Sequence, residues 1–224
     1  MKSKVDRLLG VIFIFCIVGC IVSFRVYQVK NKDRISDYKK SRKIYSTIQS
    51  VEDLKPKVSK KAKIKVPQID FKKLLSINTD IKFYLKLRGT DIKYPVVQGS
   101  DNDFYSHRLV TKERNYGGSL MLDCRCKTDP QNNTLVVYGH NMKDGSMFGN
   151  LDKYRDTGYL LKHKDVWLIS EQHAYLFKIE KCVITSKDSK LYKTKKRGKL
   201  LLSTCAYEGK DSRLVLVCNL AGIF

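Results

Sequence analysis

Apolar residues near the N-terminus form one unbroken run, whereas those further along the chain recur in short groups. The run from Leu8 to Phe24 has seventeen residues and no charge. Because an α-helix rises about 1.5 Å per residue, it nearly crosses a hydrocarbon layer about 30 Å thick. Lysine or arginine flanks both of its ends. The pattern predicts an uncleaved membrane anchor at residues 8–24, preceded by a short tail at residues 1–7.

Two other interpretations of this run are less favoured. A cleaved signal peptide needs a small-x-small site after the apolar run, and Val22-Ser23-Phe24-Arg25 is a poor one. A buried helix of a soluble protein would not be apolar on every face at the start of a chain. The positive charges on both flanks leave the orientation open. Since the tail has only seven residues, the functional domain is expected after residue 25.

Residues 25–65 form a basic juxtamembrane segment. Apolar residues spaced mostly by three, four or seven predict one amphipathic helix or two short ones, ended by Pro56. Lys57 to Lys65 then has the composition of a basic linker. From Arg25 to Lys73 there are sixteen Lys or Arg and five Asp or Glu, a net charge of +11. This segment suits anionic lipid headgroups or an anionic wall polymer, and a solvated spacer without a partner is the equally weighted alternative.

Short apolar or alternating runs follow Val66, separated by clusters of Gly, Asn, Asp and Pro. Runs of this length between turn residues predict β-strands. Eight are expected, at Ile81–Leu87, Tyr94–Val97, Ser119–Leu122, Thr134–Tyr138, Val166–Ile169, Tyr175–Ile179, Leu200–Thr204 and Leu214–Leu220. Helical patterns occur at Phe71–Ser76 and Ser146–Tyr154. Residues 66–224 are therefore predicted to form a mainly β domain, either a barrel or a sandwich.

Composition narrows the possible partners. The 224 residues include 44 Lys or Arg and 22 Asp or Glu, a net charge of +22, so a polyanion is the expected partner. Nucleic acid is not expected if the domain after the anchor lies outside the cell. Hydrophobic residues at 42% exclude wholesale disorder. Seven irregularly spaced cysteines do not fit a small disulfide scaffold.

The last two predicted strands place a thiol beside a guanidinium. The first ends at Cys205 and the second begins near Arg213, with a turn-like Glu208–Asp211 between them. A hairpin centred on Gly209 would put Cys205 opposite Arg213, with their side chains on one face. A permanent cation there favours the thiolate and can donate hydrogen bonds to an oxyanion.

Four histidines are candidates for a base that works with this thiol. His140 follows an apolar strand and a glycine, which places it at a strand end facing a cleft. Taken alone, a structural role for His140 is about as well supported as a catalytic one. His163 and His173 lie among polar residues and are expected on the surface. His107 could support a site, but surface or loop packing is favoured for it.

The remaining cysteines suggest no further chemistry. Cys16 and Cys20 lie in the apolar run, and Cys182 and Cys218 are expected in the core. Cys124 and Cys126 are two apart on an expected strand and would share a face. No other ligands are suitably spaced, so neither a metal site nor a cofactor is predicted.

Taken together, these motifs resemble the sortases, the membrane-anchored cysteine transpeptidases of Gram-positive bacteria. Leu202-Ser203-Thr204-Cys205 with Arg213 is similar to the segment around the sortase nucleophile, and Thr134–Met142 to the segment with the family's histidine. Longer stretches indicate class B. These are Phe71–Asn78, Tyr94–Tyr105, Gly118–Asp123 and His140–Gly149. The resemblance covers roughly residues 66 to 220.

The resemblance implies an eight-stranded β-barrel with N-terminal helices, outside the membrane, and a single-pass anchor with a cytoplasmic tail. It implies that Cys205 attacks the carbonyl after the threonine of a C-terminal sorting motif. Arg213 would hold the substrate or its oxyanion, and His140 would protonate the leaving amine. An amino group of peptidoglycan or its lipid-linked precursor would then resolve the thioester. By motif position, the substrate cleft is expected to include Ser203, Thr204, Asn102 and Tyr105.

One departure from the class B pattern concerns the interval from Val183 to Lys199. Class B enzymes usually have a long, helix-containing insertion here, whereas this interval is short and rich in lysine. We therefore expect a more open and more basic groove, with a different recognised peptide or an impaired copy. Ser106 also stands where the class often has a larger apolar residue. The alternatives to a transpeptidase are a cysteine peptidase or hydrolase, and a non-enzymatic module that binds the wall.

Overall fold

The computed structural model describes residues 4–49, 57–58, 64–206, 208–209 and 211–224. The chain forms two compact units, Met1–Lys40 and Ser41–Phe224. The boundary lies inside helix α1 (Lys4–Gln49), so the last residues of that helix belong to the second unit. Pro56 and residues 59–63 of the predicted linker lie outside the described residues.

Helix α1 runs without a break through both the apolar run and the amphipathic segment. One or two separate helices were expected after residue 30. A single helix forms because no proline or glycine occurs between Arg25 and Gln49 to interrupt it. Among the described residues, only its segment Val11–Gln49 is long and apolar enough to cross a membrane, with a mean hydropathy of 2.1 over its apolar window. The helix is therefore compatible with the predicted anchor.

The C-terminal end of α1 packs within the second unit. Tyr45 and Ile48 are buried there. The hydroxyl of Tyr45 donates to the carbonyl of Gly118 over 3.2 Å, and its ring meets that of Tyr94 edge-on at 5.1 Å. Residues assigned from the sequence to a juxtamembrane spacer therefore help to build the globular unit.

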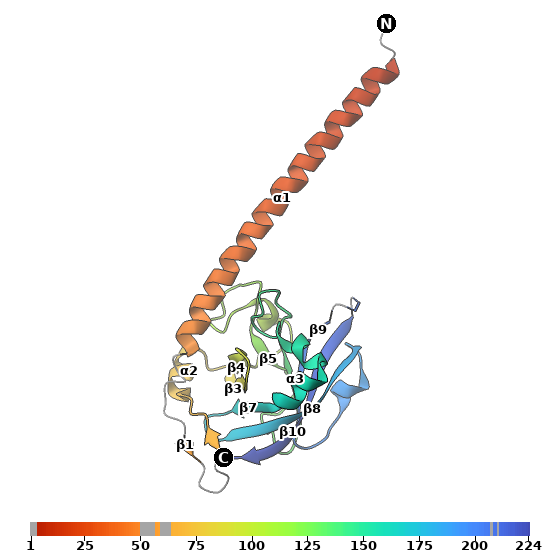
Figure 1. The fold of residues 1–224 in the computed structure, drawn as a ribbon. Coiled ribbons are helices and arrows are strands. Elements are labelled where there is room, and N and C mark those ends of the chain that lie inside the picture. Colours follow the sequence, from red (N-terminus) through yellow and green to blue (C-terminus); the bar gives the residue numbers. More distant parts are fainter. Residues whose placement is uncertain (1–3, 50–56, 59–63, 207, 210) are drawn as a thin grey trace. The chain divides into compact units, whose positions relative to one another are not determined.

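Eight strands form a closed barrel (Figure 1). They are β3 (Ile81–Leu87), β4 (Lys93–Val97), β5 (Leu120–Leu122), β6 (Thr134–Tyr138), β7 (Asp165–Ile169), β8 (Ala174–Ser186), β9 (Lys199–Cys205) and β10 (Ser212–Ile223). Around the barrel their order is β10-β8-β7-β3-β4-β5-β6-β9. β4 with β5 and β6 with β9 are parallel, and the other pairs are antiparallel.

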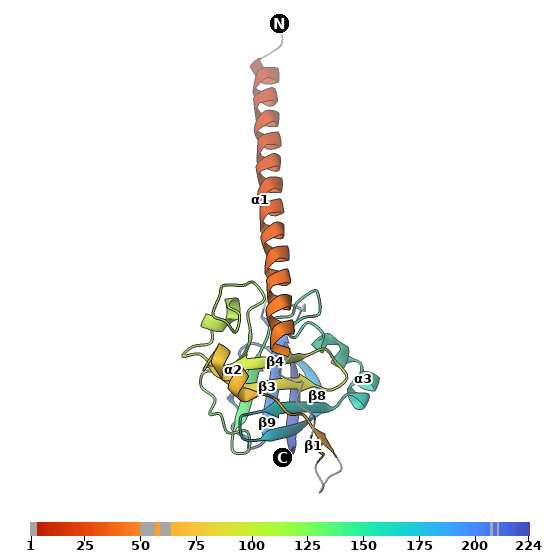
Figure 2. The ribbon, with the colours of Figure 1, turned by 90° about the vertical axis from the view of Figure 1, so that its left-hand side faces the viewer.

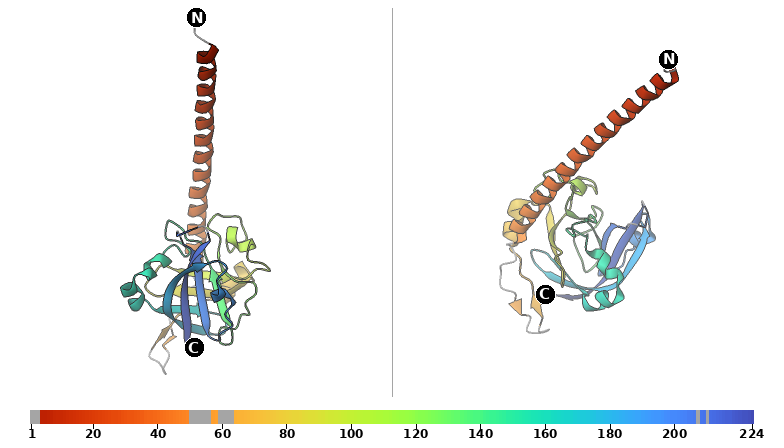
Figure 3. Two further views of the ribbon diagram at one scale, coloured as in Figure 1. Left: turned by 90° about the vertical axis from the view of Figure 1, so that its right-hand side faces the viewer. Right: turned by 45° about the horizontal axis from the view of Figure 1, so that its top comes forward.

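All eight predicted strands are present, so the mainly β prediction is confirmed as a barrel rather than a sandwich. The main difference is β8, which continues seven residues beyond Ile179. Its second half is mostly exposed or half-buried, so no apolar run marks it in the sequence. It is held instead by pairing with β10. On its other side β10 pairs with β9, so β10 lies between β8 and β9 (Figure 3).

Short helices connect the strands. α2 (Phe71–Ile77) is confirmed where it was predicted, and the Asp70 side chain caps it by accepting from the Lys73 N–H at 3.1 Å. α3 (Thr157–Lys162) was not expected, and it lies on a different side of the barrel from α2 (Figure 2). The remaining short elements are the 3₁₀ turns η2 (Phe104–His107), η3 (Leu151–Arg155) and η4 (Lys190–Lys193), and the small strands β1 (Lys57–Val58) and β2 (Lys65–Val66), which pair with each other.

The helix predicted at Ser146–Tyr154 is wrong for most of its length, because only η3 forms there. Met147 has a φ of 50°, in the left-handed region that a right-handed helix cannot include. A side chain at Gly149 would also put its Cβ 2.0 Å from the Met142 carbonyl oxygen. The local backbone is therefore a close-packed loop.

A small apolar cluster covers one face of three neighbouring strands. Because side chains alternate along a strand, residues two apart share a face. Val136 on β6, Leu201 on β9, and Val215 and Val217 on β10 form this cluster. Leu191 and Tyr192 of η4 pack against it, so the short lysine-rich loop between β8 and β9 is anchored on apolar side chains.

Candidate active site

The β9–β10 hairpin places Cys205 beside Arg213. The two residues are direct partners in the antiparallel register, as the sequence predicted. Facing residues in such a pair have Cβ atoms about 4.5–5.5 Å apart and point to the same side. Cys205 is exposed at the end of β9. Its sulfur is therefore accessible and next to a permanent cation.

β6 brings His140 to the same end of the barrel. It runs parallel to β9, with Tyr138 opposite Ser203. Beyond the strand, the Gly139 N–H donates to the Ser203 carbonyl over 3.1 Å. Asn141 then donates from Nδ2 to the Cys205 carbonyl over 2.8 Å. His140 thus lies between two contacts that tie its segment to the strand of the nucleophile.

The position before His140 has no room for a side chain. A Cβ at Gly139 would lie 2.4 Å from Cδ2 of Leu120 and 2.7 Å from Cδ2 of the buried Phe148. We expect Gly139→Ala to lower the free energy of unfolding by about 1–3 kcal/mol, the usual cost of overpacking. Fluorescence of the single tryptophan, Trp167, during urea unfolding measures this. Gly19→Ala is the control, since a Cβ there meets nothing within 4 Å, and equal losses in both variants would contradict the packing argument.

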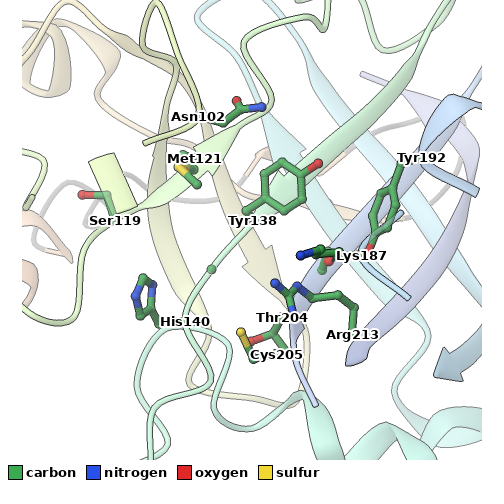
Figure 4. A pocket seen from close by; sticks show the side chains of 12 residues that line it. Asn102, Ser119, Met121, Tyr138, His140, Lys187, Tyr192, Thr204, Cys205 and Arg213 are labelled. Carbon is green, nitrogen blue, oxygen red and sulfur yellow. Dashed lines mark hydrogen bonds between the residues drawn. The ribbon is translucent and has the colours of Figure 1, made fainter. Parts of the chain in front are cut away.

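His140, Cys205 and Arg213 line one cleft with a volume of about 340 Å³. Figure 4 shows the sulfur of Cys205 between the imidazole and the guanidinium. The complete lining comprises Asn102, Ser119, Met121, Tyr138, Gly139, His140, Lys187, Tyr192, Ser203, Thr204, Cys205 and Arg213. Two of these side chains, Lys187 and Arg213, carry a permanent positive charge, and none of the lining residues is a carboxylate.

His140 lies beside two other aromatic rings. The rings of His107 and Tyr116 lie 5.6 Å and 6.4 Å from it, both inclined edge-on. Burial lowers the pKa of His140, and repulsion from His107 lowers it further. The imidazole is therefore held neutral at neutral pH, ready to accept a proton.

From the sequence, His107 was expected on the surface or in loop packing rather than beside His140. Its position allows a test of the electrostatic coupling between the two histidines. We expect His107→Asn to raise the pKa of His140, because it removes one of the two causes that lower it. The Hε1 resonances of the histidines, followed against pH in detergent-solubilised protein, measure the change. His173→Asn is the matched control, since that histidine is exposed and its ring contacts Tyr175. An unchanged or lower His140 pKa in His107→Asn would contradict the coupling.

Arg213 uses little of its hydrogen-bonding capacity inside the protein. Among the described residues, its side chain donates one hydrogen bond, from Nη1 to the Ser212 carbonyl at 3.0 Å. A guanidinium has five N–H donors, so others can serve a ligand. Lys187, also in the cleft, forms an ion pair of 3.0 Å with Asp211. Arg213 is therefore the better donor for an anionic oxygen.

Of the four residues predicted to contact the substrate, three line the cleft and one does not. Asn102, Ser203 and Thr204 line the cleft. Oγ1 of Thr204 is buried and has no hydrogen-bond partner in the described structure. Tyr105 is not among the lining residues and is only 1% exposed. Its hydroxyl bonds to Asp80 at 2.6 Å and to Asn78 at 2.8 Å, which gives it a structural position.

Two tyrosines in the cleft, Tyr138 and Tyr192, were not predicted from the sequence. Tyr138 precedes His140 by two residues, and strand alternation could have identified it. Its hydroxyl donates to Asp123 at 3.0 Å. Tyr192 comes from η4, and no sequence signal pointed to it. Its hydroxyl lies 2.8 Å from Oγ of Ser203, and its ring lies 6.2 Å from that of Tyr138.

Asp123 holds one side of this arrangement. It is buried and receives two side-chain hydrogen bonds from Arg125, at 2.9 Å and 2.6 Å. Burial acts to raise its pKa, but the bonds from Arg125 and Tyr138 outweigh it and lower the pKa to about 2. Asp123 is therefore a permanently ionised anchor for Tyr138 and Arg125.

The other cysteines stay outside the cleft. Cys124 and Cys126 lie in a turn after β5, so the expected shared strand face is wrong; the chain turns there because Asp123 accepts the Arg125 N–H. Cys218 is buried as expected, whereas Cys182 is only half-buried. All seven cysteines are free thiols. In the described ranges no three His, Cys, Asp or Glu side chains are grouped to hold a metal ion.

Comparison with known proteins agrees with this geometry. The Sortase domain family matches residues 85–221, which is more than half of the chain. Sortase B of Listeria monocytogenes is 30% identical over 155 residues, covering 69% of this chain and 58% of that protein. Sortase B of Staphylococcus aureus is 28% identical over 166 residues, covering 72% and 63%. The chain therefore spans less than two thirds of the length of these curated relatives.

Solved structures show the same fold. The crystal structure of sortase B from Bacillus anthracis matches with a TM-score of 0.67 and 29% identity, covering 84% of this chain and 99% of that one. The closed eight-stranded barrel with an N-terminal helix therefore matches the fold of sortase B structures. The chain belongs to the sortase family, and the relatives it resembles are class B sortases.

Proposed function

We propose that this chain is a membrane-anchored cysteine transpeptidase that joins proteins to the cell wall. Its substrates would be secreted proteins with a C-terminal sorting motif, cleaved after threonine. The observation that carries the proposal is the common cleft of Cys205, His140 and Arg213. Acyl transfer requires a nucleophile, a proton carrier and an oxyanion donor within reach of one carbonyl group, and these side chains have those three chemistries.

In the first step, the sulfur of Cys205 bonds to the carbonyl carbon of the substrate. His140, neutral at rest, accepts the thiol proton as the sulfur attacks. Arg213 donates hydrogen bonds to the oxygen that gains negative charge. When the carbon–nitrogen bond breaks, the His140 imidazolium passes its proton to the departing amine. A thioester between Cys205 and the substrate remains.

In the second step, an amino group replaces the sulfur. The amine nitrogen bonds to the thioester carbon, and the carbon–sulfur bond breaks. His140 accepts the proton that the amine loses and passes it to the departing sulfur, which restores the Cys205 thiol. An amino group of peptidoglycan, or of its lipid-linked precursor, is the proposed acceptor. Neither of these two proposed reaction steps uses a cofactor.

The proposed membrane orientation follows from the proposed substrates, because secreted proteins and peptidoglycan lie outside the membrane. Residues 8–24 form the single-pass anchor and residues 1–7 the cytoplasmic tail, with the catalytic barrel from residue 66 outside. The basic segment at residues 25–65 would contact anionic headgroups or wall polymer. Protease treatment of intact cells, followed by detection of tags at each terminus, tests this orientation, because only an external barrel is digested.

A peptide assay tests the proposed reaction. The full-length protein in detergent is incubated with a library of sorting-motif peptides, with and without triglycine or diaminopimelate. Transfer of the acyl half to the amine is expected. Hydrolysis without transfer would instead indicate a peptidase, and no reaction with any peptide would indicate a non-enzymatic wall-binding module. Either of these two results contradicts the proposed function.

A further inference from the structure

A second hollow adjoins the cleft at the opposite end from His140. It has a volume of about 530 Å³ and is called the basic basin here. Its lining comprises Asp123, Arg125, Cys126, Lys127, Asn132, Asn133, Thr134, Val136, Tyr192, Lys193, Thr194 and Lys195. β6 contributes its floor, the loop after β5 contributes one wall, and η4 with the residues after it contributes the other.

Both walls of the basic basin are held in place. Oγ1 of Thr134 donates to the Lys196 carbonyl at 2.7 Å and accepts from the Lys196 N–H at 3.0 Å. On the other side, Nε2 of Gln98 donates to the carbonyls of Asp123 and Cys126, at 3.0 Å and 2.8 Å. The hollow is therefore a built feature of the fold.

The basic basin is continuous with the cleft through Tyr192, which lines both. The hydroxyl of Tyr192 is fixed by Ser203, inside the cleft, at 2.8 Å. Val136 and Thr134, on the basin floor, precede the cleft residue Tyr138 on the same face of β6. An extended ligand that follows the direction of β6 and passes over Tyr192 would run from one hollow into the other.

Charge sets the kind of ligand that the basic basin can hold. Four cations line it, namely Arg125, Lys127, Lys193 and Lys195, and the only carboxylate is Asp123. The side chain of Asp123 is 3% exposed and already pairs with Arg125 at 2.6 Å. In the described part of the chain, no ion pair joins any of the three lysines to a carboxylate. Their charge is available to an anionic ligand.

The direction of the substrate follows from the proposed reaction, on which this inference rests. His140 must reach the nitrogen of the departing half, so that half lies on the His140 side of Cys205. The retained half lies on the other side of the sulfur, where Figure 4 shows Arg213 and Tyr192. Upstream residues of the substrate therefore leave the cleft towards the basic basin.

The strand register gives the length of chain that is needed. On β9, Leu201 pairs with Val136 and Lys199 with Thr134, four and six residues before Cys205. At about 3.3 Å per residue these positions lie roughly 13 Å and 20 Å from the nucleophile. An extended peptide has a similar rise, so its residues about four to six before the one acylated by Cys205 reach the basin; these are the fifth to seventh residues before the scissile bond.

We propose that the basic basin binds an acidic stretch of the substrate protein, located about five to seven residues before the scissile bond. The basin thus selects among proteins that share one sorting motif. Two of its four cations, Lys193 and Lys195, come from the short lysine-rich loop between β8 and β9, which gives that loop a role in recognition. Exposed charge pairs contribute modestly each, and two or three together give about a tenfold preference at low salt.

A peptide series tests this proposal. Peptides share one motif and differ at positions five to seven before the scissile bond, which are all Glu, all Ser or all Lys. Relative kcat/KM is measured with the full-length protein, and binding is measured by fluorescence anisotropy with Cys205→Ala. We expect the Glu peptide to exceed the Ser peptide about tenfold and the Lys peptide to be poorest, with differences that shrink in high salt.

Reversing the charge of two basin lysines gives a test that a partial loss of folded protein cannot mimic, because misfolding lowers activity on all peptides and does not invert the preference. Lys193→Glu with Lys195→Glu should invert the preference, so that the Lys peptide becomes the best. Lys162→Glu with Lys164→Glu is the matched control, because it makes the same change of net charge in a separate hollow beside α3. The control should keep the preference for the Glu peptide.

Three outcomes would overturn the proposal: equal use of all three peptides, an unchanged preference after charge reversal, or the same inversion in the control. If the reversal weakens binding of a polyphosphate chain but leaves peptide preference unchanged, the basin serves an anionic polymer and the proposal is wrong. If the wild type processes no peptide, the proposed reaction fails, and anisotropy with Cys205→Ala still decides whether the basin prefers acidic peptides.

Discussion

Cys205→Ala is expected to reduce cleavage of a sorting-motif peptide by about 10⁴-fold or more, because the proposed acyl intermediate is a thioester on the Cys205 sulfur. Among the residues lining the cleft, Cys205 is the only thiol. Cleavage is measured by chromatography of the peptide products. In the wild type without an amine, mass spectrometry should show the protein with the acyl half attached, and the variant should show no such adduct.

Cys124→Ala is the matched control for this substitution. Cys124 is a half-buried free thiol in the turn after β5, and its backbone N–H rather than its sulfur bonds to Asn102. It should keep wild-type activity and the acyl adduct. Substantial cleavage by Cys205→Ala, or an adduct mapped to a different residue, would refute the proposed mechanism.

Arg213→Lys is expected to lower kcat/KM by about 10²–10³-fold, the usual effect of removing an oxyanion donor. Lysine keeps the positive charge, but it lacks the planar fork that presents several N–H groups in fixed directions. The fall should appear mainly in kcat, because the charge on the oxygen is largest in the transition state. Steady-state kinetics with one sorting-motif peptide separates kcat from KM.

Arg88→Lys provides the comparison for Arg213→Lys. Arg88 is 77% exposed and pairs with Asp165 at 3.3 Å, beside the hollow near α3. The same chemical change there should leave both kinetic constants as in the wild type. If Arg213→Lys also left kcat unchanged, a guanidinium contact to the developing oxyanion would be excluded.

Much of the barrel was predictable because its signals are local. Runs such as Ile81–Leu87 and Thr134–Tyr138 coincide with β3 and β6 residue for residue. A buried strand needs a short apolar stretch bounded by turn residues, and both are visible in the sequence. The second half of β8 was missed because partner strands, not its own apolar pattern, hold it.

The catalytic pairing was partly predictable for a related reason. Cys205 and Arg213 are joined by one hairpin, so counting from Gly209 is enough to place them opposite each other. His140 comes from β6, 65 residues before the cysteine, and its approach to β9 depends on a parallel pairing that no local pattern encodes. For this residue, resemblance to a family supplied what spacing alone left open.

By itself, the sequence determined the apolar helix, the eight barrel strands and the residues with reactive chemistry, because these depend on neighbours within a few positions. Only the tertiary structure decided that His107 adjoins His140, that Tyr105 is buried, and that Tyr192 lines both the cleft and the basic basin. These positions depend on the closure of the barrel, which brings η2, η4, β6 and β9 together from distant parts of the chain. Contacts of that kind arise from packing between elements and leave no periodic trace within any one of them.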